Sequence, residues 1–598
     1  MSPRLAPVLL FALALGLRTA YILEIDDSPT FTHPPVDGQT YVKQAEYIAA
    51  GNWLGRGQEP FWQPPLYPYL LGLFRLFFGG DSFFYAVRLF QALAGAGTCL
   101  LAWHLGGRLF HPGVGLAAGA AAAVYGPLIY FDGEILPASL ATFLDLAGLA
   151  LLLRCLRMPT APGFLGAGAL FGLATLTVPT VLSFAAGAAV FIWVKVRRCA
   201  PFSAPRLAFP AAFVLGVLLP ILPVAVRNVA IGGDAVLISY NAGVNFYVGN
   251  NENYDESVGI RPGWEWDELL DRPREESGIT RPSGRSAFFF SQSWEFISSR
   301  PADYLGLLAR KLFLFWHGDE IGRNQGIYFW RNYSDILGMT LWKLVISFPF
   351  GLVAPLAVAG ALLAFRRDGA SLPLLFIALY SISVIAFFVT SRYRLPVVPL
   401  LLIHAAYAGH CLAAGLKDGN RRAAGFPALC IALLLPAANF RVGAMDLEGD
   451  AAIHFNLGVA HMVKRDAPAA RREFELAVAR DPTHWQAWFN LGTTSAIQGD
   501  LEGAIPVYER VLEAHPDRVI AWVSLARARR QLGDREGARQ AYEAGLSADP
   551  VAFNYYGRYA ELIELCMQMG DRSCAERVLG IARRHFPDET RRLRRLLP

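Results

Sequence analysis

The sequence is poor in charge and in cysteine. Only 17% of its 598 residues are charged, 54% are hydrophobic, and seven are cysteines. This composition excludes an ordinary soluble enzyme and favours a membrane protein with a soluble part. The net charge of +5 does not indicate nucleic-acid binding, because no basic patch is interleaved with aromatic residues. The cysteines and histidines also lack the spacing of a zinc site.

Eleven apolar runs approach the length that crosses a bilayer, which is about 20 residues. They lie at 5–23, 84–105, 113–130, 135–153, 163–177, 179–194, 207–226, 341–365, 372–389, 395–416 and 426–439. We therefore predict an all-α transmembrane domain over residues 1–440, with large loops at 24–83 and 230–338. No small-residue cleavage site follows the first run, so we expect a retained span rather than a signal peptide.

Basic residues in the short loops give the expected orientation, because such residues collect on the cytoplasmic side. They all fall on one side of the predicted spans, at Arg4, Arg108, Arg154, Arg157, Lys195, Arg197, Arg198, Arg366, Arg367, Lys417, Arg421 and Arg422. We therefore expect a cytoplasmic N-terminus and extracytoplasmic large loops. After eleven spans, everything beyond Arg441 is also expected outside.

Beyond Asn439 the long apolar runs stop and a repeat begins. Small residues, aromatic residues and a closing proline recur in register every 34 positions, in the second repeat as Trp488, Leu491, Gly492, Ala504, Tyr508 and Pro516. This is the tetratricopeptide pattern. It predicts an α-solenoid of about four repeats over residues 450–590, whose concave face binds a protein or peptide. The alternative is a passive stabilising domain.

Two cysteines, Cys566 and Cys574, lie in the part of the repeats expected outside. Disulfides persist in oxidising compartments, so a disulfide between these residues is one alternative. Two buried thiols are the preferred interpretation.

The first large loop carries the stretch "VDGQTYVKQAEYIAAG", which has the pattern of an amphipathic helix. Asp37 stands at its head, where it either caps the helix or serves a reaction. In the following "FWQPPLYPYLLGLF", Pro64, Pro65 and Pro68 predict that no regular helix forms and that the chain turns back toward the membrane.

Other outer segments also carry polar residues. The turn "YFDGEIL" places Asp132 and Glu134 between two spans, where carboxylates are unfavourable without a partner or a function; a solvated turn is the alternative. In "NAGVNFYVGNN", the amides of Asn245 and Asn250 suit sugar hydroxyls or phosphates.

Two basic pairs lie on the side of the membrane where arginine and lysine are less common. In "TSRYRLP", Arg392 and Arg394 suit a phosphate, with snorkelling toward the membrane surface as the alternative. In the helix expected over 301–320, Arg310 and Lys311 accompany interfacial aromatic residues. We expect that helix to lie on the membrane surface.

In this order, the motifs resemble those of the polytopic GT-C glycosyltransferases, which use lipid-linked sugars. That superfamily includes protein O-mannosyltransferases and the aminoarabinose transferase of lipid A. The resemblance covers about residues 1–420 and rests on Asp37, "WQPPLYPY", "YFDGEIL", the asparagine loop and "SRYRLP". It is greatest to a bacterial branch with a tetratricopeptide tail, which implies a multi-pass protein of the bacterial inner (plasma) membrane.

The resemblance implies transfer of a sugar from a polyprenyl phosphate to a hydroxyl of a protein, glycan or lipid. Asp37 is then the base, because a hydroxyl nucleophile must give up its proton. Arg392 and Arg394 meet the leaving phosphate. Glu134, with Asp132 in reserve, orients the acceptor or helps to hold a divalent metal, the one cofactor left open. The other expected substrate-binding residues are Asn245, Asn250, Gln63 and Tyr67.

Two positions depart from the family pattern. Many relatives have Glu directly after the first-loop Asp, where this chain has Gly38. Relatives often have a basic residue before the proline of "TLTVPT", where this chain has Val178.

Two other functions remain as alternatives. One is a polysaccharide ligase or polymerase that transfers a whole lipid-linked glycan. The other is a non-catalytic membrane scaffold that presents the repeats to a partner.

Overall fold

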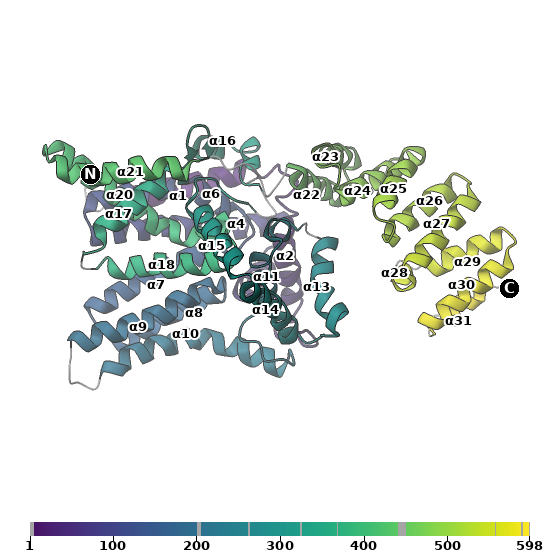
Figure 1. Cartoon of the computed structure of the whole chain (residues 1–598), viewed down its shortest axis with the longest axis horizontal. Helices are drawn as coiled ribbons and strands as arrows, with labels where there is room; N and C mark the ends of the chain where they lie inside the picture. The colour runs from purple at the N-terminus through teal and green to yellow at the C-terminus, as the bar shows by residue number, and fades with distance from the viewer. Residues whose placement is uncertain are drawn as a thin grey trace. The chain divides into compact units, whose positions relative to one another are not determined.

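The computed structural model describes residues 5–199, 205–260, 263–322, 326–367, 369–440, 450–555, 558–587 and 590–596. Arg4 and Arg441, and the side chains of Arg197, Arg198, Arg421 and Arg422, lie outside the described part. The chain divides into two compact units, Met1–Glu448 and Gly449–Pro598. Both are helical (Figure 1), and the strands described are the short antiparallel pair β1 (Trp342–Lys343) and β2 (Ser347–Phe348).

Each of the predicted apolar runs contains a helix, although the run 341–365 begins with β1 and β2 and becomes helical only at Phe350. Among the described residues, six helical segments are long and apolar enough to cross a membrane: α1 (Leu5–Glu24), α4 (Gly80–Leu109), α7 (Ala138–Arg157), α9 (Leu182–Cys199) with the short helix Pro179–Val181 before it, α10 (Pro205–Ala230), and α20 (Val398–Lys417) with the short helical turns that precede it from Ser391. The pair α5 (Pro112–Ala123) and α6 (Gly126–Gly133), bent by 50°, makes a seventh if it is one span. The remaining predicted runs form shorter apolar helices: α8 (Ala161–Thr175), α17 (Phe350–Ala364), α18 (Ser371–Ala386) and α21 (Arg421–Ala438).

Small residues let these helices pack closely. A Cβ on Gly168 of α8 would lie 2.0 Å from the carbonyl oxygen of Phe213 on α10, and one on Gly216 of α10 would lie 2.1 Å from that of Leu165. The two backbones therefore touch, as small residues allow in membrane helices. The predicted all-α membrane domain is confirmed.

The first outer loop forms two packed helices, α2 (Asp37–Ala49) and α3 (Leu66–Phe77). The prediction that the prolines prevent a regular helix is wrong. Pro65 precedes α3, and Pro68 lies in its first turn, where a backbone N–H has no intrahelical acceptor to lose.

The second outer loop folds around an apolar core of its own. Its helices are α11 (Ala242–Gly249), α12 (Tyr254–Val258), α13 (Trp264–Ser277), α14 (Pro282–Ser299) and α15 (Pro301–Trp316). That core also includes Phe388, which follows α18. Lys311 of α15 is fully buried, and Arg310 forms two hydrogen bonds of 2.9 and 2.7 Å to Asp255. Lys311 therefore does not reach a membrane surface, whereas the Arg310 side chain is 44% exposed, and the location of this helix on the membrane surface stays a prediction.

The second unit consists of helical hairpins, as the repeat pattern predicts. They are α22 (Asp450–Val463) with α23 (Ala467–Arg480), α24 (Trp485–Ile497) with α25 (Leu501–Ala514), α26 (Val519–Gln531) with α27 (Arg535–Ala548), and α29 (Arg558–Gln568) with α30 (Arg572–His585). The short helices α28 (Pro550–Tyr555) and α31 (Thr590–Leu593) lie between and after them. A Cβ on Gly492 would lie 2.8 Å from the ring of Tyr508, which explains the recurring pair of glycine and aromatic residue. The tetratricopeptide solenoid is confirmed.

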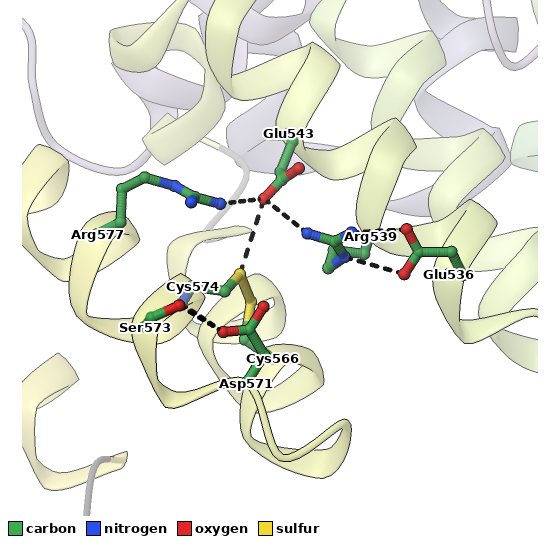
Figure 2. Close-up of a disulfide and its surroundings, with 8 residues drawn as sticks. All are labelled: Glu536, Arg539, Glu543, Cys566, Asp571, Ser573, Cys574 and Arg577. Carbon is green, nitrogen blue, oxygen red and sulfur yellow. Dashed lines mark hydrogen bonds and ion pairs between the residues drawn. A yellow bond between two sulfur atoms is a disulfide. The ribbon is translucent and has the colours of Figure 1, made fainter.

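A disulfide joins Cys566 of α29 to Cys574 of α30 (Figure 2). Both residues are fully buried. Near this bond, Glu543 accepts a hydrogen bond of 2.6 Å from Arg577. The preferred interpretation of two free thiols is therefore wrong.

Candidate active site

One pocket of the membrane unit is lined by segments that are distant in sequence. It brings together the head of α2, the acidic turn and the "TSRYRLP" motif, through Pro35, Val36, Asp37, Gly38, Tyr130, Phe131, Leu136, Thr390, Ser391 and Arg392. Ile321, Gly322 and Ile327 complete the lining. Three of the motifs singled out in the sequence therefore meet at one place.

At this pocket, Arg392 and Asp37 form an ion pair. The Nη1 atom of Arg392 lies 2.6 Å from Oδ2 of Asp37, and the two side chains are 22% and 27% exposed. Arg392 also donates a hydrogen bond of 3.0 Å to the hydroxyl of Tyr393. The pair is thus partly open to the pocket, where a substrate can compete for either partner.

Asp37 does not cap its helix. It is the first residue of α2, the N-cap is Val36, and no side chain accepts a hydrogen bond there. The capping interpretation is therefore wrong. Burial raises the pKa of the neighbouring Tyr41 well above its usual value, so that phenol stays protonated.

The backbone beside Asp37 is constrained. Val36 has a φ of 49°, which is a strained conformation for a β-branched residue. Such strain often accompanies functional sites. A Cβ on Gly38 would lie 2.8 Å from the Cβ of Pro34. The glutamate that many relatives have at this position would therefore not fit here without movement of the proline.

The acidic turn is held from inside the membrane unit. Arg18 of α1 lies 2.5 Å from the carboxylate of Asp132, and both side chains are almost fully buried. Gln91 of α4 donates hydrogen bonds to the carbonyl oxygens of Asp132 and Glu134, at 2.9 and 2.6 Å. Glu134 is itself 7% exposed. The interpretation of a solvated turn is therefore wrong.

Tyr67 and Gln63 are both buried. The hydroxyl of Tyr67 donates to Oε1 of Gln91 at 2.5 Å, so Tyr67 supports the side chain that holds the turn. Gln63 is 9% exposed, and its Oε1 atom has no hydrogen-bond partner among the described residues.

Arg394 does not line the pocket. It is 2% exposed and lies 2.7 Å from the carboxylate of Glu320. Its guanidinium also donates to the carbonyl oxygens of Phe315 and His317, at 3.2 and 2.8 Å, and lies over the ring of Phe350. Arg394 thus contacts protein groups, whereas the two sequence interpretations were contact with a phosphate and snorkelling toward the membrane surface.

The two predicted asparagines lie on α11 and at its end, and neither lines the pocket. Asn245 donates to the carbonyl oxygen of Asn241 at 3.0 Å. Asn250 is fully buried and donates to the carbonyl oxygens of Phe246 and Ala386, each at 2.8 Å.

Sequence reasoning missed Arg18, Arg88, Gln91 and Glu320, and it singled out Lys311 only as part of a basic pair on a membrane-surface helix. The first three had a signal, because charged or amide side chains within apolar runs usually have a partner or a function. Arg88 donates to the carbonyl oxygen of Gly133 at 2.6 Å. In the described part of the chain, no group of three His, Cys, Asp or Glu residues could hold a metal ion. The described residues therefore do not form a site for the divalent metal that the resemblance left open.

Two segments of the chain match known families. Residues 62–226 match the family of dolichyl-phosphate-mannose-protein mannosyltransferases. That family supports a membrane glycosyltransferase. Residues 455–519 and 497–553 match tetratricopeptide repeats. Together the matches fit a GT-C glycosyltransferase followed by such repeats.

Several solved structures are similar to part of this chain. MamA from Desulfovibrio magneticus RS-1 has 18% identity and a TM-score of 0.21, over 32% of this chain and 94% of that one. YrrB, described as a TPR protein with an unusual peptide-binding site, has 17% identity and a TM-score of 0.21, over 31% and 86%. PilF of Pseudomonas aeruginosa has 18% identity and a TM-score of 0.17, over 30% and 91%. No curated protein matches the chain.

Proposed function

We propose that this protein transfers a hexosyl or pentosyl group from a polyprenyl-phosphate-linked donor to a hydroxyl of a protein, glycan or lipid. The observation that carries the proposal is the pair of Asp37 and Arg392 at one pocket. A base and a phosphate-binding cation are the two groups that this reaction needs.

In the proposed reaction, the acceptor oxygen forms a bond to the anomeric carbon while the bond from that carbon to the phosphate oxygen breaks. The hydroxyl proton goes to the carboxylate of Asp37. The polyprenyl phosphate leaves with the bonding electrons, and Arg392 meets its charge. Because Arg392 pairs with Asp37 in the structure, an arriving phosphate would draw the guanidinium away and free the carboxylate.

We assign the other predicted residues supporting roles. Glu134 orients the acceptor, and Asp132 fixes the turn through Arg18. Tyr67 acts through Gln91, and the unpartnered Oε1 of Gln63 is a candidate substrate contact. Arg394, Asn245 and Asn250, which lie against protein groups, are assigned to positioning of the outer loops.

We place the reaction on the extracytoplasmic face of a bacterial inner membrane, with a cytoplasmic N-terminus. Two observations support this orientation. The basic loop residues fall on one side of the predicted spans, and the disulfide between Cys566 and Cys574 suits an oxidising compartment. We further propose that the repeats recruit a protein partner or acceptor. Residues 450–590 immobilised on beads should then retain an extracytoplasmic protein, and retention of none would contradict that role.

The test of the reaction uses the full chain in vesicles with a polyprenyl-phosphate sugar. Both Asp37→Asn and Arg392→Ala should lower kcat by at least about 100-fold. Asp27→Asn, a change at an exposed carboxylate of the same loop, should leave it unchanged. Full activity of Asp37→Asn would contradict the proposed base.

Mass spectrometry of the product separates the alternative functions. Addition of one sugar supports the proposal, whereas addition of a whole glycan identifies a ligase or polymerase. A wild-type protein that transfers neither would be a scaffold.

A further inference from the structure

Lys311 is a buried lysine whose contacts are all neutral. It lies on α15, is fully buried, and its Nζ atom is 2.8 Å from each of three oxygens: the carbonyl oxygens of Gly249 and Phe387 and the Oδ1 of Asn250. Buried lysines are rare unless paired with an acid. No carboxylate contacts this ammonium among the described residues, so its position calls for another explanation.

The three acceptors belong to two helix ends. Gly249 is the last residue of α11 and Asn250 is its C-cap, and Phe387 is the C-cap of α18. The last carbonyl groups of a helix lack intrahelical donors and carry partial negative charge, so a cation is favourable there. The amide of Asn250 joins the same two ends through its bonds to Phe246 and Ala386.

The contact between these helix ends is close. A Cβ on Gly249 would lie 2.0 Å from the carbonyl oxygen of Phe387. The ends of α11 and α18 therefore meet backbone to backbone, with Lys311 of α15 bonded to both. One side chain links three elements.

This junction leads directly to the candidate active site. The chain continues from Phe387 to Phe388, which belongs to the apolar core of the outer loop, and whose ring lies 5.5 Å from that of Tyr393. Thr390 then accepts a hydrogen bond from the backbone N–H of Tyr393. Arg392 follows within the same segment and reaches Asp37.

We infer that Lys311 is a positioning residue: by joining the ends of α11 and α18, its ammonium group holds segment 387–392 so that Arg392 faces Asp37 in the pocket. This inference rests on the proposed glycosyl transfer. It gives helices α11 and α15 of the second outer loop a part in the reaction although they supply no residue to the pocket.

The number of donors makes this role depend on protonation. An ammonium group donates three hydrogen bonds, which matches the three acceptors, whereas a neutral amine donates two. Burial lowers the pKa of Lys311 to about 7. Helix α12 carries two titratable groups on this side: Tyr254, whose ring centre lies 5.9 Å from Nζ, and Asp255, which pairs with Arg310. As pH rises through about 7, the amine loses one of its bonds.

The first experiment compares Lys311→Met with Lys43→Met, which changes an exposed lysine of α2. In vesicles, Lys311→Met should lower kcat roughly 10- to 100-fold, because a small displacement of a catalytic group has effects of that size. The KM for the acceptor should change less than twofold. Lys43→Met should match the wild type, and a Lys311→Met variant with wild-type kcat overturns the inference.

Two readouts separate positioning from a general structural role. In the Arg392→Ala background, Lys311→Met should cause no further loss of kcat, because residues that act through one another are not additive. In the wild type, kcat should fall as pH rises through about 7, and this fall should be absent in Lys311→Met and in Arg392→Ala. An additive loss, or a fall that persists in both variants, overturns the inference.

If Lys311→Met does not fold, the inference is tested by the pH dependence of kcat in the wild type and in Arg392→Ala. A fall near pH 7 that disappears in Arg392→Ala supports the inference, and a fall that is missing from the wild type overturns it. The proposed function fails separately, when Asp37→Asn and Arg392→Ala keep full activity. If those two variants are inactive but Lys311→Met behaves as the wild type, this inference alone fails.

Discussion

Two arginine–aspartate ion pairs in the membrane unit have similar distances between nitrogen and oxygen but differ in their exposure to solvent. Arg392 and Asp37 are 2.6 Å apart, with side chains 22% and 27% exposed. Arg18 and Asp132 are 2.5 Å apart, with side chains 1% and 2% exposed. Both pairs involve a motif that the sequence singled out. They differ in whether another molecule can reach them.

This difference separates two roles for the same chemical groups. A partly exposed pair loses little when a substrate replaces one partner, because water and the substrate compensate. A buried pair cannot exchange partners, since removal of one charge leaves the other unpaired in a medium of low dielectric constant. We therefore expect the first pair to serve the reaction and the second to serve the fold.

The largest expected effect concerns the buried pair. Arg18→Met leaves Asp132 buried without its cation, which should lower the free energy of unfolding by about 3–5 kcal/mol. Arg18 also donates to the carbonyl oxygens of Ala14 and Ala123, so those contacts are lost as well. Denaturant unfolding in detergent measures the change. The double variant Arg18→Met with Asp132→Asn should recover part of the loss, and a loss below about 1 kcal/mol for Arg18→Met would remove the contrast between the pairs.

Sequence reasoning singled out three of the segments that line the pocket but could not say which of two neighbouring arginines faces it. Arg392 and Arg394 are two positions apart in the short helix α19 (Ser391–Arg394). Two positions in a helix correspond to a rotation of about 200°, so the side chains point in nearly opposite directions. One meets Asp37 and the other meets Glu320. Which of the two faces the pocket depends on tertiary packing, which the motif does not encode.

The repeats were easier to predict because their contacts are local. The pair of Gly492 and Tyr508 lies within one hairpin and recurs with the repeat length, so register alone identifies it. Lys311 shows the opposite case. Its partners Gly249 and Phe387 are 62 and 76 residues away, and nothing in the helix pattern of α15 distinguishes a buried lysine from one at the membrane surface.

A smaller loss of stability is expected for a substitution at Gly38, the residue next to Asp37 of the exposed pair. Gly38→Ala places a methyl group 2.8 Å from Pro34, and overpacking of this kind destabilises by about 1–3 kcal/mol. Because Gly38 follows Asp37, kcat should also fall. Gly16→Ala is the matched control, since a Cβ there meets nothing within 4 Å. Equal effects of the two substitutions would show that the backbone beside Asp37 tolerates displacement.

The smallest effect on stability is expected for Asp37→Asn. The ion pair with Arg392 is partly exposed, and such pairs contribute at most about 1 kcal/mol. The free energy of unfolding should therefore change by less than about 1 kcal/mol, and less again at high salt, where exposed charges are screened. The same preparation is then assayed for transfer. A large loss of stability would assign Asp37 to the fold, as with Asp132, whereas a near-native stability with lost turnover would mean that the carboxylate is kept for the reaction.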